Sequence, residues 1–218
     1  IALGEAVNFL QPSSTASVLA RVLGGGPSLI AGRLSANGNL FLTNTAGIKF
    51  SASAMVNVNN FVASSLDVAT HNFLTGNYIF ERSPGSPYAQ VSNEGTMSGN
   101  NVALMGSRVK NTNLVSARVG TLHLVSGDKT TVSFDSQGLI HVAVNAETGS
   151  NDAGDHQMIA DAAIENSGTL EGKQVILDAQ VARGLFKNAV NQTGIIRSTA
   201  LVEENGVIRI TANRNVQV

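Results

Sequence analysis

The chain has 218 residues, of which 43% are hydrophobic and only 13% are charged, and it contains no cysteine. The hydrophobic content is sufficient for a folded core and argues against intrinsic disorder. A net charge of −1 provides no basic surface for a nucleic-acid backbone, so we expect no nucleic-acid partner. No run of about 18 apolar residues occurs, so we expect no insertion into a membrane.

Apolar residues at alternate positions predict short β-strands along most of the chain. Asn, Gly or Ser residues, which favour tight turns, separate many of them. Short strands at this spacing are typical of an all-β protein. In chain order the apolar pairs are Leu40/Leu42, Ile48/Phe50, Val56/Val58, Leu66/Val68, Val102/Leu104, Leu122/Leu124, Val132/Phe134, Ile140/Val142/Val144, Val175/Leu177 and Ile208/Ile210.

An internal repeat indicates which all-β architecture is present. Residues 93–104 align without gaps to residues 166–177, and half of the aligned residues are identical. Looser copies start at Asn111 and Asn191. Units of about 20 residues fit one coil of a β-solenoid. We therefore predict a right-handed parallel β-helix of about ten coils, about 50 Å long at about 4.8 Å per coil.

Conserved positions within these units predict columns of stacked side chains. Asn93, Asn111 and Asn166 occupy equivalent places in three units. Stacked asparagine side chains hydrogen-bond along a β-stack. We expect these residues to form one such column.

Two segments, residues 71–90 and 145–163, depart from the repeat. The first contains four aromatic residues and a Pro-Gly turn, which predicts a hairpin or loop that projects from the β-helix. The second is polar and then helix-like over 156–163. We expect a single domain, residues 1–218, with both segments as extra-helical excursions.

Ordered sequence blocks in the first part of the chain identify a family resemblance. Residues 7–14, 21–28, 61–68 and 126–129 resemble the secretion domain of two-partner-secretion exoproteins, the filamentous-haemagglutinin-like family. Residues 40–48 fall where that family has its Asn-Pro-Asn-Gly-Ile motif. The family's second motif, Asn-Pro-Asn-Leu, has no counterpart, and the capping segment that normally precedes the block at 7–14 is expected to be missing.

The candidate secretion motif departs from the family pattern at its centre. Asn44, Gly47 and Ile48 match it, whereas Thr45 and Ala46 replace Pro and Asn. Asn and Gly also suit left-handed turn positions. The motif residues therefore either contact the outer-membrane transporter that such secretion domains use or only form a turn.

The resemblance implies a function in protein export without enzymatic activity. Such domains cross the periplasm unfolded and are recognised by the periplasmic domains of a dedicated outer-membrane transporter. They then fold outside the cell and nucleate the β-helix that follows. The resemblance thus implies a secreted or cell-surface location in a Gram-negative bacterium, and it leaves open a host surface ligand for the full-length protein.

Two other functions remain as alternatives. An adhesin or passenger module that binds host glycans or proteins would be supported by exposed aromatic residues in 71–90. A carbohydrate-active β-helix enzyme would need clustered acids, but the acids here are scattered.

The densest acidic group, Asp152, Asp155, His156 and Asp161, lacks the pattern of a calcium loop and is expected to be a solvated loop. His123 and His141 alternate outwards on their strands and are expected at the surface. We expect no catalytic, cofactor or metal site.

Overall fold

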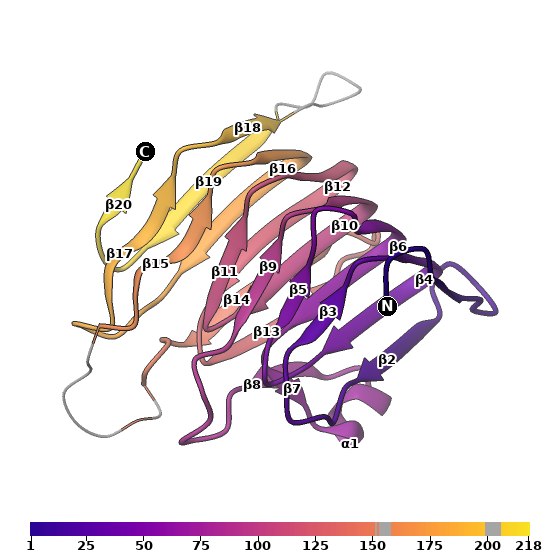
Figure 1. Cartoon of the computed structure of the whole chain (residues 1–218), viewed down its shortest axis with the longest axis horizontal. Helices are drawn as coiled ribbons and strands as arrows, with labels where there is room; N and C mark the ends of the chain where they lie inside the picture. The colour runs from indigo at the N-terminus through magenta and orange to yellow at the C-terminus, as the bar shows by residue number, and fades with distance from the viewer. Residues whose placement is uncertain (151, 153–157, 199–205) are drawn as a thin grey trace.

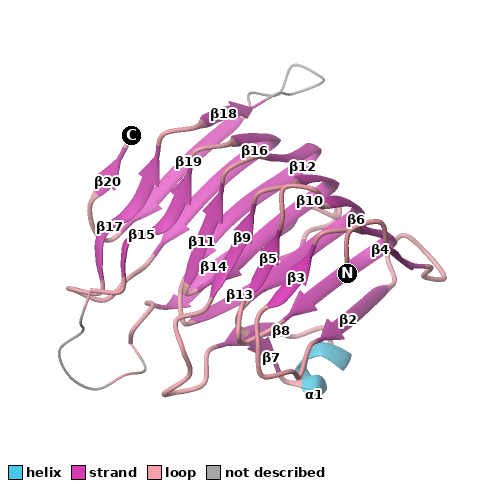
Figure 2. Cartoon of the chain, viewed as in Figure 1, coloured by secondary structure: helices cyan, strands magenta, loops and turns pink. Residues whose placement is uncertain are grey.

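The computed structural model describes residues 1–218 except 151, 153–157 and 199–205, and these described residues are almost entirely in strands and turns (Figure 2). Long parallel strands lie side by side and follow one another in chain order along the molecule (Figure 1). The predicted parallel β-helix is therefore confirmed.

Two parallel sheets form the walls of the β-helix. The large sheet has nine strands, and the small sheet has seven. The large sheet consists of β1 (Ala6–Phe9), β2 (Ser17–Arg21), β4 (Arg33–Thr43), β6 (Met55–Ser64), β10 (Thr96–Gly106), β12 (Leu114–Ser126), β16 (Thr169–Ala179), β18 (Ile195–Ser198) and β19 (Val207–Ala212). The small sheet consists of β3 (Ser28–Ile30), β5 (Ile48–Phe50), β9 (Gln90–Asn93), β11 (Arg108–Asn111), β15 (Ala160–Asn166), β17 (Phe186–Gln192) and β20 (Val216–Gln217).

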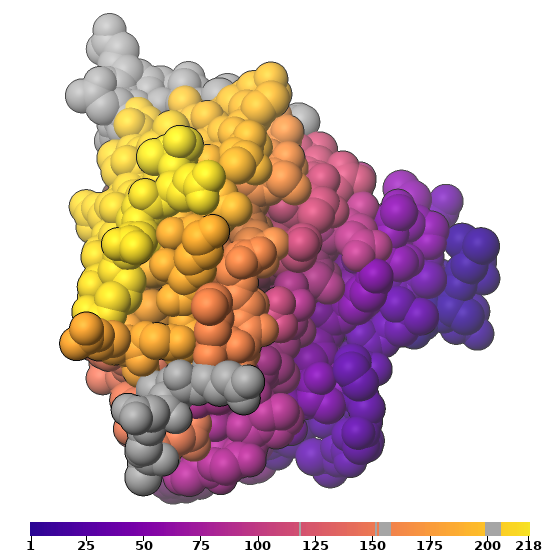
Figure 3. Space-filling view, turned by 60° about the vertical axis from the view of Figure 1, so that its left-hand side comes forward, coloured from indigo at the N-terminus to yellow at the C-terminus, as the bar shows by residue number. Residues whose placement is uncertain are grey.

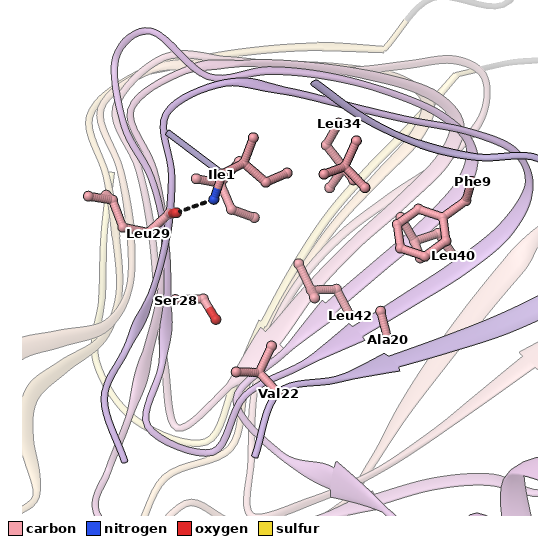
Figure 4. A pocket seen from close by; sticks show the side chains of 11 residues that line it. Ile1, Phe9, Ala20, Val22, Ser28, Leu29, Leu34, Leu40 and Leu42 are labelled. Carbon is pink, nitrogen blue, oxygen red and sulfur yellow. Dashed lines mark hydrogen bonds between the residues drawn. The ribbon is translucent and has the colours of Figure 1, made fainter. Parts of the chain in front are cut away.

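The large sheet covers two sides of each coil because its long strands bend in the middle. β4 pairs with β1 through its first half and with β2 through its second half. Its register with β6 shifts between Ala36 and Asn39, and β10 and β12 shift at equivalent places. Such irregularities bend a strand. The small sheet closes the third side, which gives the coils the three-sided outline visible in Figure 4.

The interior of the β-helix is a stack of apolar columns. Leu34, Val56, Met97, Val115 and Leu170 are neighbours on successive strands, and none is more than 3% exposed. Burying each such side chain contributes about 1.5–3 kcal/mol. The alternating pattern of the sequence thus follows from the inward and outward positions of each strand.

The described residues form seven coils, as the seven strands of the small sheet show, rather than the predicted ten. The chain leaves the coil path between β6 and β9 and again between β12 and β15, so the residues of these excursions add no coil. The second excursion thus starts after Ser126 and includes residues 127–144, which precede the expected start at 145. At about 4.8 Å per coil the stack is about 30 Å long. In Figure 3 the colours pass in chain order across the molecule, as expected for stacked coils.

A four-stranded antiparallel sheet lies outside the β-helix and is formed by the excursions. It consists of β7 (Asp67–Val68), β8 (Tyr78–Glu81), β13 (Lys129–Phe134) and β14 (Ile140–Ala146). The short helix α1 (Thr70–Leu74) precedes β8. This outer sheet encloses a second apolar core, in which Phe41, Val62 and Ala103 of the large sheet contact Phe80 and Ile140.

The helical turn predicted at 156–163 is wrong for the residues that the structure describes. Residues 156 and 157 lie outside them, and β15 begins at Ala160. Ala162 and Ile164 are buried, and β15 pairs with β11 and β17 on either side. Pairing with two neighbouring strands overrides the local helical preference.

No helix within the described residues is long and apolar enough to cross a membrane.

Candidate functional site

The candidate motif Asn44–Ile48 forms the turn that leads from β4 to β5. Asn44 is 1% exposed, and its Nδ2 donates hydrogen bonds to the Gly26 carbonyl at 3.0 Å and to Ser28 Oγ at 2.9 Å. Its Oδ1 accepts a hydrogen bond from the Ala46 backbone N–H at 2.9 Å. Asn44 therefore both closes its own turn and connects it to the preceding coil.

Gly47 is required by the geometry of this turn. Its φ of +109° is a conformation that side chains rarely adopt, and a Cβ here would lie 2.9 Å from the Gln90 carbonyl oxygen. Ile48 is buried in the main core, whereas Thr45 is exposed. The structure thus brings the five motif residues together in one turn. Among them, Thr45 presents its side chain to solvent.

A buried ion-pair cluster connects the two excursions, and the sequence analysis missed it. Arg82 follows β8 and donates from Nε and Nη2 to the two carboxylate oxygens of Asp128, both at 2.8 Å. The side chains are 2% and 0% exposed. Arg82 Nη2 also contacts Asp152 at 2.6 Å, and Nη1 donates to the Ser86 carbonyl at 2.7 Å. The guanidinium lies 4.4 Å from the centre of the Tyr88 ring.

The charges of this cluster shift the pKa values of its members in opposite directions. Hydrogen bonds from Tyr88 and Arg82 lower the pKa of Asp152, while burial and the bond to Asp152 raise the pKa of Tyr88 to about 12. The hydrogen bond to Asp128 and the nearby carboxylates raise the pKa of Arg82 above its ordinary value. Asp152 and Arg82 are therefore charged and Tyr88 is neutral near neutral pH.

The position of Asp152 in this cluster differs from what was expected for the acidic group of the second excursion. Asp152 was expected in a solvated loop, but it is only 25% exposed and pairs with Arg82. Asp161 is exposed on β15, and Asp155 and His156 lie outside the described residues. Among the residues with described positions, no group of three or more His, Cys, Asp or Glu side chains is placed to hold a metal ion.

His123 is buried, contrary to the prediction that it lies at the surface. It points outwards from the large sheet, but the outer sheet covers it and leaves it 1% exposed. Its Nε2 donates to the Ile140 carbonyl at 3.0 Å, and its Nδ1 has no hydrogen-bond partner. Burial lowers the pKa of His123 to about 4. His141 is exposed as predicted and lies 3.1 Å from Asp135.

The predicted asparagine column is confirmed. Asn93 donates to Asn111, Asn111 donates to Asn166, and each bond is 2.8 Å long. The next member is Gln192, which accepts from Asn166 at 2.8 Å, so the repeat copy placed at Asn191 is displaced by one residue.

A second amide column was not predicted. It runs from Asn39 through Asn60 to Asn101, with two bonds of 2.7 Å. Asn101 also donates to the Gly138 carbonyl at 3.0 Å and accepts from Thr121. This column therefore attaches the β13–β14 hairpin to the β-helix. The sequence signal was an asparagine at the bend of each of the three long strands β4, β6 and β10.

An apolar cavity of about 300 Å³ opens into the main core at the end of the β-helix near β1 (Figure 4). Phe9, Ala20, Leu34, Leu40 and Leu42 contribute to its wall. The Ile1 amino group donates to the Leu29 carbonyl at 3.0 Å across this end. Val7 and Val22, which also line the cavity, are 39% and 37% exposed, whereas the middle coils are closed by their neighbours.

A parallel β-helix with an antiparallel sheet on its flank and an asparagine turn between its sheets defines a secretion-type β-helix domain. The family model of the TPS secretion domain matches residues 1–215, and the chain belongs to this family. It is therefore a two-partner secretion domain, which serves the export of an exoprotein across the bacterial outer membrane and implies a partner transporter in that membrane.

Similar proteins agree with this assignment. The crystal structure of the HMW1 secretion domain from Haemophilus influenzae superposes with a TM-score of 0.60 at 25% identity, over 97% of this chain and 55% of that one. The heme/hemopexin-binding protein of Haemophilus influenzae is 36% identical over 76 residues, which make up 35% of this chain and 8% of that protein. The same protein of a second strain is 35% identical over 68 residues, again 8% of its length.

Proposed function

We propose that this domain is the amino-terminal secretion domain of a large exoprotein. The periplasmic domains of the partner transporter recognise it before it folds. Outside the cell it then nucleates the folding of a β-helix. The match of the secretion-domain family to residues 1–215 carries this proposal. The chain spans 8% of the curated relatives it matches, so the activity of the full-length protein is proposed to lie in other segments.

The environment of the motif favours recognition of the unfolded chain. In the folded domain the Asn44 side chain is buried and bonded to Gly26, Ser28 and Ala46. A transporter that reads this side chain must therefore do so before the turn closes. In the folded state Thr45 remains accessible.

The last coil supports the proposed nucleation of further coils. β18 and β19 lie at the end of the large sheet, and β20 lies at the end of the small sheet. Ile195 and Ile208 are 50% and 49% exposed there. A following coil would pair with these strands and cover these side chains, as in other solenoids.

The cavity near β1 supports a cap at the other end. We propose that a preceding segment of the full-length protein covers Val7, Phe9 and Val22, in the place of the expected capping segment. Apolar cavities of this kind in a main core are normally closed, because exposed apolar surface is unfavourable.

Site-specific crosslinking during export tests recognition of the motif. A photoreactive residue is placed at position 45, at position 46 or, as a control, at Asn145, which is exposed on β14. We expect crosslinks from 45 and 46 to the periplasmic domains of the transporter while the chain is in transit, and far fewer from 145. Crosslinks from 45 that form only after the domain has folded would contradict recognition of the unfolded chain.

The position of most aromatic residues in 71–90 weakens the adhesin alternative as the main function of the domain. Phe80 is fully buried, and Phe73 and Tyr78 pack against Phe41 with ring centres 5.2 and 4.7 Å away. These residues mainly hold the outer sheet on the β-helix. Exposed aromatic residues in 71–90 were the feature that would have favoured this function.

A further inference from the structure

A second cavity, of about 490 Å³, lies between the large sheet, β8 and the turn that joins β13 to β14. This volume is within the range of small-molecule sites, about 300–1,000 Å³. The secretion features described above do not involve it. Its wall includes Ser17, Asn60, Tyr78, Phe134, Asp135 and Gln137.

One side of this cavity is aromatic and held rigidly. The rings of Tyr78 and Phe134 lie 6.0 Å apart at 82° to each other. Both pack on Phe41, with ring centres 4.7 and 6.3 Å away, and Phe41 is fully buried in the second core. Because Phe41 fixes both rings, their partly exposed surfaces keep their position without a ligand.

The other side is polar and equally fixed. Asn60 accepts from Asn101 and donates to Asn39 within the second amide column. The carboxylate of Asp135 accepts from the Gln137 and Leu139 backbone N–H groups at 2.8 and 2.9 Å, which holds the hairpin turn. Gln137 itself is exposed at the rim. The cavity therefore presents amide, hydroxyl and carboxylate groups opposite an aromatic surface.

The charges select the class of ligand. The residues that line the cavity include no lysine or arginine that could pair with an anion, and the one acidic residue among them, Asp135, already has His141 Nε2 3.1 Å from its carboxylate. A pyranose ring is neutral, carries hydroxyl groups that bond to amides and carboxylates, and has an apolar face whose C–H groups pack on aromatic rings. We propose that this cavity binds a neutral saccharide unit. The domain would then contact glycans after export, in addition to directing secretion.

This proposal is tested by calorimetric titration of the folded domain. The ligands are the methyl glycosides of glucose, galactose, mannose and N-acetylglucosamine. Methyl glucuronide serves as the anionic probe. At concentrations up to about 10 mM, a range that detects weak sites, we expect at least one neutral glycoside to bind and the glucuronide to bind more weakly.

Variants assign the binding to the cavity. Phe134→Leu should weaken it roughly tenfold, and Gln137→Ala, at an exposed rim position, should weaken it by a factor of about three to five. Asn145→Ala, on β14 but outside this cavity, should leave it unchanged. Circular dichroism checks that each variant is folded, and Gln137→Ala keeps the test valid should Phe134→Leu lose structure.

Three results would overturn the proposal. The first is no binding of any neutral glycoside. The second is undiminished binding in Gln137→Ala or in a folded Phe134→Leu variant. The third is tighter binding of the glucuronide than of its neutral counterparts.

Discussion

Arg82 and Asp128, 46 positions apart in the chain, form an ion pair with two parallel hydrogen bonds of 2.8 Å, and neither side chain is more than 2% exposed. The pair joins the segment after β8 to the turn before β13. It therefore connects the two excursions that build the outer sheet.

Removing Arg82 should destabilise the domain strongly. Arg82→Met leaves the Asp128 carboxylate buried without its partner, and breaking a buried pair in this way costs about 3–5 kcal/mol. The double variant Arg82→Met/Asp128→Asn should regain part of this loss, because the only carboxylate of the cluster still without Arg82, that of Asp152, is 25% exposed to solvent. Urea unfolding monitored by circular dichroism measures the free energy of unfolding of both variants.

Lys129→Met provides the control for the buried pair. Lys129 and Glu81 form a nearby ion pair at 3.4 Å with side chains 40% and 51% exposed. Such exposed pairs contribute less than about 1 kcal/mol. An Arg82→Met variant no less stable than Lys129→Met would contradict the structural role of the cluster.

His123 should make stability dependent on pH in the acid range. Its pKa is about 4 when folded and 6.5 in the unfolded chain, so between these values the unfolded state binds a proton that the folded state does not. Stability is thus fully present above pH 6.5 and falls as the pH decreases towards 4, by an amount on the order of 3 kcal/mol.

Replacing His123 should remove this dependence. Gln is neutral and keeps a donor for the Ile140 carbonyl, so His123→Gln should flatten the stability profile between pH 6.5 and 4. The exposed His71→Gln, on α1 and not a contributor to the shift of His123, is the control and should retain the slope. Equal slopes in wild type and His123→Gln would show that His123 does not titrate as the structure requires.

The asparagine column should contribute measurably to stability. Asn111→Ala removes the donor to Asn166 and the acceptor for Asn93, and leaves both of these buried groups without that partner. Unsatisfied buried polar groups cost about 1–3 kcal/mol each, so we expect a loss of about 2–4 kcal/mol. Asn145→Ala, at an exposed position, should change the free energy of unfolding by less than about 0.5 kcal/mol. Similar losses in the two variants would argue against the column.

Gly47→Ala should disturb the motif turn without altering any of its polar side chains. The positive φ and the short approach to the Gln90 carbonyl make a Cβ unfavourable, at a cost of about 1–3 kcal/mol. Gly24 has open space around it and an ordinary φ, so Gly24→Ala is a matched control. Thermal unfolding compares the two, and an unchanged midpoint for Gly47→Ala would contradict the described turn.

Features that repeat along the chain could be predicted from the sequence. The columns of Val56 and Met97, and of Asn93 and Asn111, repeat because each coil presents the same positions to the same neighbours. The column member after Asn166 was misplaced by one residue, because Asn191 resembles its predecessors more than Gln192 does. Local similarity does not report register.

Features produced by the outer sheet could not be predicted in the same way. Arg82 and Asp128 meet only because β8 pairs with β13, and no spacing in the sequence indicates this pairing. The burial of His123 did have a signal. The apolar run of β12 around it, Leu122 to Val125, is nearly continuous rather than alternating, which is typical of a strand buried on both faces.

The most direct test of the central claim is a measurement of export. The domain, with the residues that precede it in its natural protein, is expressed with and without its partner outer-membrane transporter, and the protein in the medium is quantified. We predict release that requires the transporter, falls when Asn44 is changed to Ala, and persists when exposed Asn145 is changed to Ala. Release without the transporter, or no release in its presence, would contradict the assignment of this domain as a secretion address.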